Sequence, residues 1–277
     1  MITPFQKDNK LKQDILSSKE NKEGLRIWWL AQSGFLVQWN GVHILFDPYL
    51  SDSLSKKYAE TDKPHVRMSE LVIDPEALDM IDLVTSSHNH TDHLDAETLI
   101  PLFEVNPNIK FVIPEANRDF VAERCKVPLS KPIGLCVDQS YALNDIKITA
   151  IPAAHNELSL DEQGRNKFLG FILNIGPYTL YHSGDTLWYE GLTQILKKHK
   201  PAIAFLPING NKPERKVAGN LNYMEAAQLG SEIDALVIPH HYDLFEFNTE
   251  DPENFVDSCI ELGTRYKVLR IGEKLEI

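Results

Sequence analysis

Four side chains that can bind a metal ion lie within six residues, at His88, His90, Asp92 and His93. They follow the apolar stretch 81–84, which is typical of a buried strand. Along an extended chain His88 and His90 point to the same side, and a following turn can bring Asp92 and His93 round to face them. A cluster of this size could be shared by two metal ions.

Further potential ligands stand where later predicted strands end. They are His155 after residues 145–152, Asp185 after residues 178–182, and His240 or His241 after residues 235–239. Taken alone, a histidine such as His155 is more often a packing residue, and Asp185 could simply cap a helix. Because loops at strand ends gather at one edge of a sheet, the joint pattern makes a shared metal site the better explanation.

All of these side chains are imidazoles or carboxylates, and none is a cysteine. Such ligands suit divalent zinc or manganese, with iron as a further option. One carboxylate can bridge two ions and hold them about 3.5 to 4 Å apart, and Asp185 is the candidate for that bridge. We therefore expect two divalent metal ions per chain.

The elements that must position these ligands begin with antiparallel strands. Apolar runs predict strands at 26–30, 34–39 and 42–47. Asn40-Gly41 between the last two is a strong hairpin signal, because both turn positions need a positive φ. Downstream the pattern predicts strands at 111–114, 145–152, 168–175, 178–182, 202–207, 235–239 and 267–271, and helices from Asp95 through Phe103 and at 116–124, 190–198, 223–231 and 252–262.

Two segments lack such patterns. The loop that includes residues 62–67 is long and polar, and is either disordered or a flap over a site. Residues 1–24 are rich in lysine and acidic residues, and are expected to form a loosely ordered N-terminal lead-in. Residues 25–277 are expected to form a single domain.

Composition excludes several classes of function. The formal net charge is −12, from 28 Lys and Arg against 40 Asp and Glu, which argues against large nucleic acids and anionic membranes as partners. No run of 18 apolar residues and no secretory signal is visible, and the scattered Cys125, Cys136 and Cys259 suit small core residues in a reducing cytoplasm. We expect a cytoplasmic protein that acts on a small anionic molecule, and a homo-oligomer remains open.

The order of the ligands resembles that of the metallo-β-lactamase-fold hydrolases. It reads His88-x-His90-x-Asp92-His93, then His155, then Asp185 in Ser-Gly-Asp, then a late histidine. The resemblance spans most of the chain. It implies an α/β (α+β) fold built as a four-layered αββα sandwich, in which two mixed β-sheets pack face to face and are flanked by helices.

The resemblance also divides the ligands between two ions. One ion would take His88, His90 and His155, the other would take Asp92, His93 and His241, and Asp185 would be shared. His241 is chosen over His240 because the family segment is similar to Ile-Pro-x-His, which places the second histidine in register. His240 would then contact a ligand or line the pocket wall, and His182 is a candidate for either role.

Within this family the chain is most similar to the L-ascorbate-6-phosphate lactonase branch. The similar segments are Trp28-Trp29-Leu30-x-x-Ser33-Gly34, the Arg67 loop running into Ile73-Asp74-Pro75, Tyr181-His182-Ser183-Gly184-Asp185, and Pro239-His240-His241-x-Asp243. This similarity implies a small anionic lactone or ester as substrate, with a sugar-phosphate lactone as one candidate.

The expected reaction is hydrolysis by a hydroxide that bridges the two ions. Metal coordination lowers the pKa of water from about 15.7 toward 7, so the nucleophile exists at neutral pH. Asp92 and Asp185 are the expected catalytic residues, because Asp92 could also orient the nucleophile or accept its proton. The alternatives are a phosphodiesterase acting on cyclic nucleotides or small RNA-type cyclic phosphates, and a non-hydrolytic di-iron or binding module of the same fold.

Other polar residues have weaker candidate roles. Asp47 could fix the tautomer of a ligand histidine, or could only form the turn before Pro48. Arg67, Lys212 and Arg215 could bind an anionic group such as phosphate, although a solvated surface charge is the better explanation for each of them. His43 and His65 are expected to be ordinary surface or packing residues, and His199 to lie on a solvated helix face.

Overall fold

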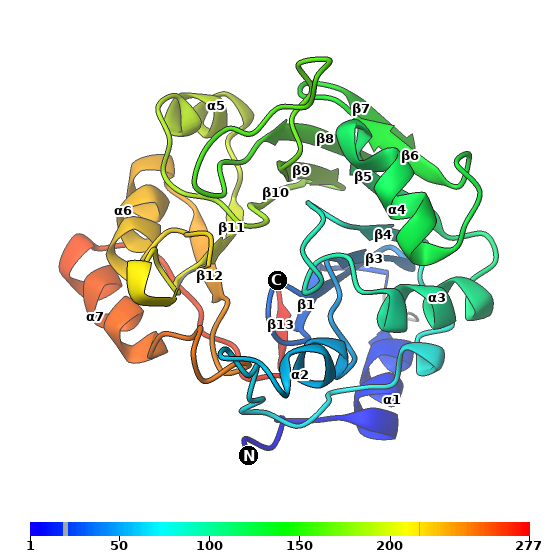
Figure 1. Ribbon diagram of the computed structural model, residues 1–277. Helices are drawn as coiled ribbons and strands as arrows, with labels where there is room; N and C mark the ends of the chain where they lie inside the picture. Colours follow the sequence, from blue (N-terminus) through cyan, green and yellow to red (C-terminus); the bar gives the residue numbers. More distant parts are fainter. Residues whose placement is uncertain (19–21, 216) are drawn as a thin grey trace.

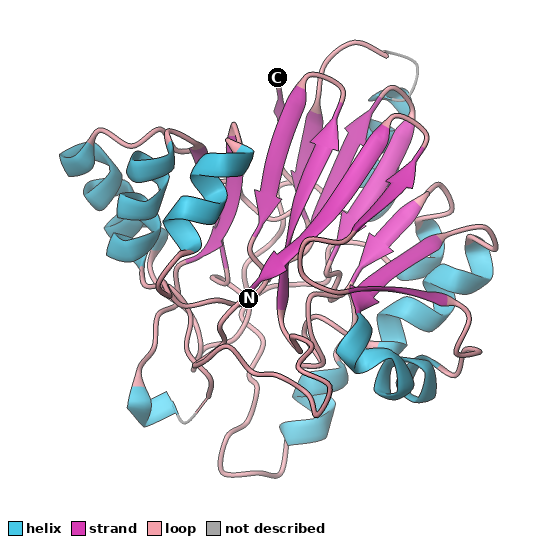
Figure 2. Cartoon of the chain, turned by 90° about the horizontal axis from the view of Figure 1, so that it is seen from above, coloured by secondary structure: helices cyan, strands magenta, loops and turns pink. Residues whose placement is uncertain are grey.

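A computed structural model describes residues 1–18, 22–215 and 217–277 of the chain. Two mixed β-sheets lie against each other, and helices cover their outer faces (Figure 1). Figure 2 shows the strands between two groups of helices. The predicted four-layered αββα sandwich is therefore confirmed.

The first sheet holds the N-terminal strands and the strand that precedes the histidine motif. Its order is β13 (Lys274–Glu276), β1 (Arg26–Trp29), β2 (Phe35–Trp39), β3 (Val42–Phe46), β4 (Leu83–Thr85), β5 (Lys110–Pro114) and β6 (Pro132–Leu135). Pairing is antiparallel from β13 to β3 and parallel from β3 to β6. The β2–β3 turn has positive φ at Asn40 (49°) and Gly41 (80°), as the hairpin signal predicts.

The second sheet carries the strands that precede the other ligands. Its order is β12 (Leu236–His240), β11 (Ile203–Pro207), β10 (Tyr178–His182), β9 (Leu169–Ile175), β8 (Ile146–Pro152) and β7 (Ser140–Leu143). Strands β10, β11 and β12 are parallel, and the pairs from β7 to β10 are antiparallel. Parallel strands run as near-continuous apolar stretches because both of their faces are covered, and β11 is buried along its whole length.

Most of the helices lie on the two outer faces. They are α1 (Asp8–Ser18), α2 (Ser53–Tyr58), α3 (Ala96–Val105), α4 (Arg118–Cys125), α5 (Leu192–His199), α6 (Tyr223–Ile233) and α7 (Pro252–Leu262), with short 3₁₀ helices at Pro75–Ala77, Glu115–Asn117 and Pro213–Arg215. Figure 1 shows α3 and α4 beside the first sheet and α5, α6 and α7 beside the second. Helix α3 begins after the predicted N-cap, where the Asp95 carboxylate accepts a hydrogen bond from the Glu97 amide. Among the described residues, no helix is long and apolar enough to cross a membrane.

Aromatic side chains pack between the two sheets and fix their relative position. Phe35 on β2 stacks on Phe205 on β11 with ring centroids 4.2 Å apart, and Phe46 on β3 stacks on His182 on β10 at 4.8 Å. Buried aromatic pairs contribute about 0.5–1.5 kcal/mol beyond the area they bury. These contacts fix the end of β10, and with it the segment that leads to Asp185.

The predicted strand at 267–271 is wrong. This stretch runs beside β12, where Lys267 donates its amide to Val237, but it makes only the isolated bridge between Val237 and Tyr266. The chain then turns at Gly272, whose φ is 78°, and forms β13 instead. The sequence pattern does not predict strands β6 and β7, because each is four residues long and only partly buried. Neither therefore shows a clear apolar pattern.

The expectation of a loosely ordered lead-in is also wrong for residues 8–18. They form α1, in which Leu11 and Ile15 are fully buried. Two apolar residues four positions apart lie on one face of a helix, so an otherwise polar segment can pack there. Asp14 ties the helix to the sheet, because its carboxylate accepts hydrogen bonds from Trp28 Nε1 (2.8 Å) and Lys274 Nζ (2.7 Å). Residues 19–21 of the expected lead-in lie outside the described residues.

The packing of α1 predicts that Ile15→Ala lowers the free energy of unfolding by about 2–5 kcal/mol, the usual result of removing a buried isoleucine side chain. Gln13→Ala, on the exposed face of the same helix, should change it little. Urea unfolding of both variants measures the difference. Equal stability of the two variants would show that α1 is not part of the packed domain.

Candidate metal centre

The sequence-predicted ligands come together at one edge of the two sheets. His88, His90, Asp92 and His93 follow β4, His155 follows β8, Asp185 follows β10, and His241 follows β12. Each therefore stands in a loop whose start is fixed by a paired strand. His88, His93, His155, Asp185 and His241 are buried, whereas His90 is exposed.

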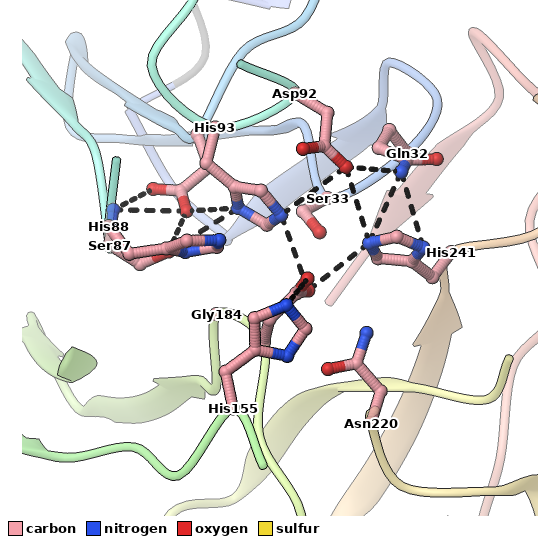
Figure 3. Close-up of polar contacts among 12 residues, drawn as sticks. Gln32, Ser33, Ser87, His88, Asp92, His93, His155, Gly184, Asn220 and His241 are labelled. Atoms are coloured by element: carbon pink, nitrogen blue, oxygen red, sulfur yellow. Dashed lines mark hydrogen bonds and ion pairs between the residues drawn. The ribbon is translucent and has the colours of Figure 1, made fainter. Parts of the chain in front are cut away.

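These side chains form two groups whose potential ligand atoms all lie within 4.8 Å of one another. The first cluster is His88, His90, His155 and Asp185, and the second cluster is Asp92, His93, Asp185 and His241. The division is the one that the resemblance implies, with Asp185 in both groups. Figure 3 shows the His93, His155 and His241 rings directed toward a common centre.

The carboxylate of Asp185 lies between the clusters. Its Oδ1 atom is 3.2 Å from His93 Nε2 and 3.2 Å from His241 Nε2, in the second cluster. Its Oδ2 atom is 3.5 Å from His155 Nε2, in the first cluster. One side chain thus offers one oxygen to each group, which is the arrangement needed to bridge two ions.

Three buried atoms in this centre suit a metal ion. Within the described part of the chain, His88 Nε2, His93 Nε2 and Asp185 Oδ1 have no hydrogen-bond partner. Leaving a buried polar atom unsatisfied costs about 1–3 kcal/mol, and binding a cation would recover that energy. Nitrogen and oxygen donors without sulfur fit divalent zinc, manganese or iron.

The charges of the centre are strongly coupled in the metal-free protein. Burial alone would raise the pKa of Asp185, but His241, His93 and His155 hold it well below its usual value. Burial lowers the pKa of His88 well below its usual value, and the neighbouring His93 and His90 lower it further. His88 is therefore neutral, and the lone pair of its Nε2 atom is available to a metal.

Asp47 fixes the orientation of His93. Its Oδ2 atom accepts a hydrogen bond from His93 Nδ1 at 2.8 Å, and both of its oxygens accept one from the Ser87 amide at 3.1 Å. Burial would raise the pKa of Asp47, but the hydrogen bond from His93 and the nearby His182 outweigh it and lower the pKa. Asp47 therefore stays ionised and accepts the Nδ1 proton of His93, which directs Nε2 toward the other members of the second cluster.

His182 and His240 lie behind the ligands rather than in front of them. Both are fully buried, and their rings stack with centroids 5.7 Å apart. His182 Nε2 lies 2.8 Å from the Ser33 carbonyl oxygen, and His240 Nδ1 lies 3.1 Å from the Ser33 hydroxyl. Burial lowers the pKa of both histidines, so both are packed as neutral rings.

A cavity of about 440 Å³ opens in front of the two clusters. Its walls include the apolar and aromatic residues Leu54, Tyr58, Phe245 and Phe247, the cations Lys57, Lys63 and Arg124, and also His65. The long loop that includes residues 62–67 therefore forms one wall, as the flap alternative predicts. His65, expected to be an ordinary surface or packing residue, packs against aromatic rings in this wall.

The three cations named as weak candidates for binding an anionic group lie outside this cavity. Arg67 donates from Nε to Asp52 at 2.8 Å and from Nη2 to the Ser51 carbonyl at 2.7 Å. Lys212 pairs with Glu250 at 2.9 Å, and Arg215 donates to the Asn209 and Thr249 carbonyls. Of the described residues, the cavity lining includes none of these three cations.

Gln32 belongs to the centre although no sequence signal singles it out. Its Nε2 atom donates to Asp92 Oδ2 at 2.7 Å and lies 3.2 Å and 3.1 Å from the two ring nitrogens of His241 (Figure 3). The side chain is buried, and both Ala31 and Gln32 have positive φ, 76° and 49°. Such backbone costs about 1–3 kcal/mol per residue and is concentrated at functional sites. Only the fold brings this turn, between β1 and β2, to the ligands.

Comparisons with known proteins agree with this geometry. The family described as the beta-lactamase superfamily domain matches residues 26–241. The UPF0173 metal-dependent hydrolase of Hyperthermus butylicus is 28% identical over 255 residues, covering 88% of this chain and 96% of that protein. Igni18, a metallo hydrolase from Ignicoccus hospitalis, shares the fold with a TM-score of 0.67 at 21% identity, over 92% of this chain and 99% of that one. The metallo-β-lactamase fold protein YhfI from Bacillus subtilis has a TM-score of 0.65 at 17% identity, over 92% of this chain and 100% of that one.

The contact between Gln32 and Asp92 predicts that Gln32→Met weakens metal binding at the second cluster about 10- to 100-fold, the usual effect of losing a partner of a ligand. Binding at the first cluster should stay the same, because Gln32 contacts none of its members among the hydrogen bonds of the described residues. Stepwise titration of the metal-free protein with Co²⁺, followed by absorbance, separates the two events. Gln163→Met, at an exposed position, is the control. Equal weakening of both steps, or of neither, would contradict the assignment.

Proposed function

Because the chain belongs to the beta-lactamase superfamily and is a metal-dependent hydrolase, we propose that its two clusters hold two divalent metal ions and that it hydrolyses a small anionic lactone or ester. The observation that carries the proposal is the Asp185 carboxylate, which offers one oxygen to each of two groups of ligands at the floor of a cavity. A sugar-phosphate lactone is one candidate substrate.

Two bound ions would supply a water whose pKa lies near 7 and would polarise the bond to be broken. Protein side chains would orient the water, accept its proton and hold the ligands in place. Asp92 has its Oδ2 atom held by the Gln32 amide, and it is placed to orient the attacking water and to accept its proton. Asp47 keeps His93 in one tautomer, and the Gly219 carbonyl lies 2.9 Å from His155 Nδ1 and does the same there. The ligands are thus oriented before a substrate arrives.

The preference for an anionic substrate rests on the cavity walls. The chain carries a net charge of −12, yet Lys57, Lys63 and Arg124 all line this cavity. Positive charges at the mouth of a cleft raise the local concentration of anions. This arrangement also suits a small cyclic phosphate, so phosphodiesters remain the second class of substrate to be tested.

The test is metal analysis followed by a hydrolysis screen over lactones, carboxylic esters, thioesters and cyclic phosphodiesters. We expect about two ions per chain after loading with zinc or manganese, and hydrolysis of at least one anionic lactone or ester. His90→Ala should lower kcat/KM by at least about 100-fold, because even a partner of a ligand costs 10- to 100-fold.

His199→Ala on α5 is the matched control, because this histidine lies outside the cavity lining. Fewer than one ion per chain under metal-replete conditions would overturn the two-metal proposal. Hydrolysis that survives His90→Ala unchanged would overturn the catalytic assignment. Turnover of cyclic phosphodiesters alone would replace the lactone or ester with the second class of substrate.

A further inference from the structure

Arg124 brings an unpaired positive charge to one side of the cavity. It lies in the last turn of α4, is half-buried, and lines the cavity. Its Nη1 atom donates to the Asn89 carbonyl at 2.7 Å and to the Leu94 carbonyl at 3.3 Å, and its guanidinium lies 4.4 Å from the centre of the Phe120 ring. Within the described ranges, no carboxylate pairs with this guanidinium. Burial lowers the pKa of Arg124, although the nearby Asp95 carboxylate acts in the opposite direction without forming an ion pair. A directly bound anion would therefore offset part of the cost of burying this cation.

The position of Arg124 places it next to the first cluster. Asn89, whose carbonyl it holds, stands between the ligands His88 and His90. An anion bound by Arg124 would therefore sit on the His90 side of the metal centre.

Aromatic rings cover a different side of the cavity. The aromatic wall consists of Tyr58, His65, Phe245 and Phe247. The His65 ring contacts the other three rings, with centroid distances of 4.3 Å to Tyr58, 4.5 Å to Phe247 and 5.2 Å to Phe245. Main-chain hydrogen bonds join the two segments that carry these rings, from the Glu246 amide to the Val66 carbonyl at 3.1 Å and from Met68 to Leu244 at 2.8 Å.

The aromatic wall belongs to the second cluster. Phe245 follows the ligand His241 by four residues, and Tyr242 and Leu244 between them are buried. Burial lowers the pKa of His65, whereas its hydrogen bond to the Lys63 carbonyl and the negative charge of Asp92 act in the opposite direction. Arg124 thus lies beside the first cluster, while the aromatic wall beside the second cluster also carries Lys57, whose Nζ atom lies 5.1 Å from the centre of the Tyr58 ring.

We propose, on the basis of the hydrolase function above, that the cavity binds its substrate in one orientation. Arg124 holds an anionic group beside the first cluster, and the aromatic wall packs against a flat apolar group beside the second. The bond to be cleaved lies between them, in front of Asp185. The substrate class is therefore an ester or lactone that carries a negative charge on one side of the scissile bond and an aromatic or similarly flat apolar group on the other.

Four esters in a two-by-two design test this orientation on the metal-loaded full chain. Monobenzyl glutarate and monomethyl glutarate are anionic, and benzyl butyrate and methyl butyrate are their neutral counterparts. Benzyl and methyl alcohols are similar leaving groups, so differences in kcat/KM report mainly on binding. We expect monobenzyl glutarate to be the best of the four, by about tenfold or more over either singly matched ester.

Two variants separate the two contacts. Arg124→Gln should lower kcat/KM for both anionic esters about 10- to 100-fold, the range for losing a charged hydrogen bond, and should leave both neutral esters within about twofold. Phe247→Ala should reduce the preference for benzyl over methyl about fivefold, the range for losing an aromatic contact, in both charge classes. Lys126→Gln and Phe5→Ala, which lie outside the cavity lining, are the controls.

Binding of N-benzylglutaramate, an amide that resists hydrolysis, gives the same comparison without turnover. If no ester is cleaved but this amide binds and loses affinity about tenfold or more in Arg124→Gln, the orientation stands and the proposed reaction fails. The orientation is overturned if the wild-type protein prefers neutral over anionic esters, or methyl over benzyl esters. It is also overturned if Arg124→Gln affects charged and neutral probes equally, or acts by lowering the metal content. The wild-type preference alone decides the matter if Arg124→Gln does not fold.

Discussion

The carboxylate of Asp185 is the interaction on which the centre depends. It is buried between two groups of histidines and offers one oxygen to each. A buried carboxylate is unfavourable unless cations or hydrogen bonds compensate its charge, and here the surrounding histidines keep its pKa well below the usual value. Two bound cations would compensate the negative charge of Asp185 more fully, which explains how this carboxylate can be buried here.

The two-sheet sandwich brings the ends of four strands together around the Asp185 carboxylate. Ligands follow β4 in the first sheet and β8, β10 and β12 in the second, so neither sheet alone completes a cluster. The Phe35–Phe205 and Phe46–His182 stacks hold the sheets together directly behind the ligands. Partners such as Asp47 and Gln32 then fix individual side chains. Core packing and metal geometry are therefore parts of one arrangement.

Features set by local sequence, and the ligand set carried by the family resemblance, were predictable, whereas several contacts between distant segments were not. The ligand motif 88–93, the Asn40-Gly41 hairpin and the Asp95 cap depend on neighbouring residues, and the structure contains all three. Gln32 meets Asp92 across 60 positions, and His65 enters the cavity wall only because its segment pairs with residues 244–246. The strand predicted at 267–271 was wrong because this stretch makes only the isolated bridge between Val237 and Tyr266 with the edge strand β12.

The sharing of Asp185 is tested most directly by anomalous diffraction from crystals of the protein loaded with zinc or manganese. Two anomalous peaks should appear, one among His88, His90 and His155 and the other among Asp92, His93 and His241, with the Asp185 carboxylate in contact with both. A single peak, or two peaks of which only one touches Asp185, would contradict a binuclear centre built on this residue.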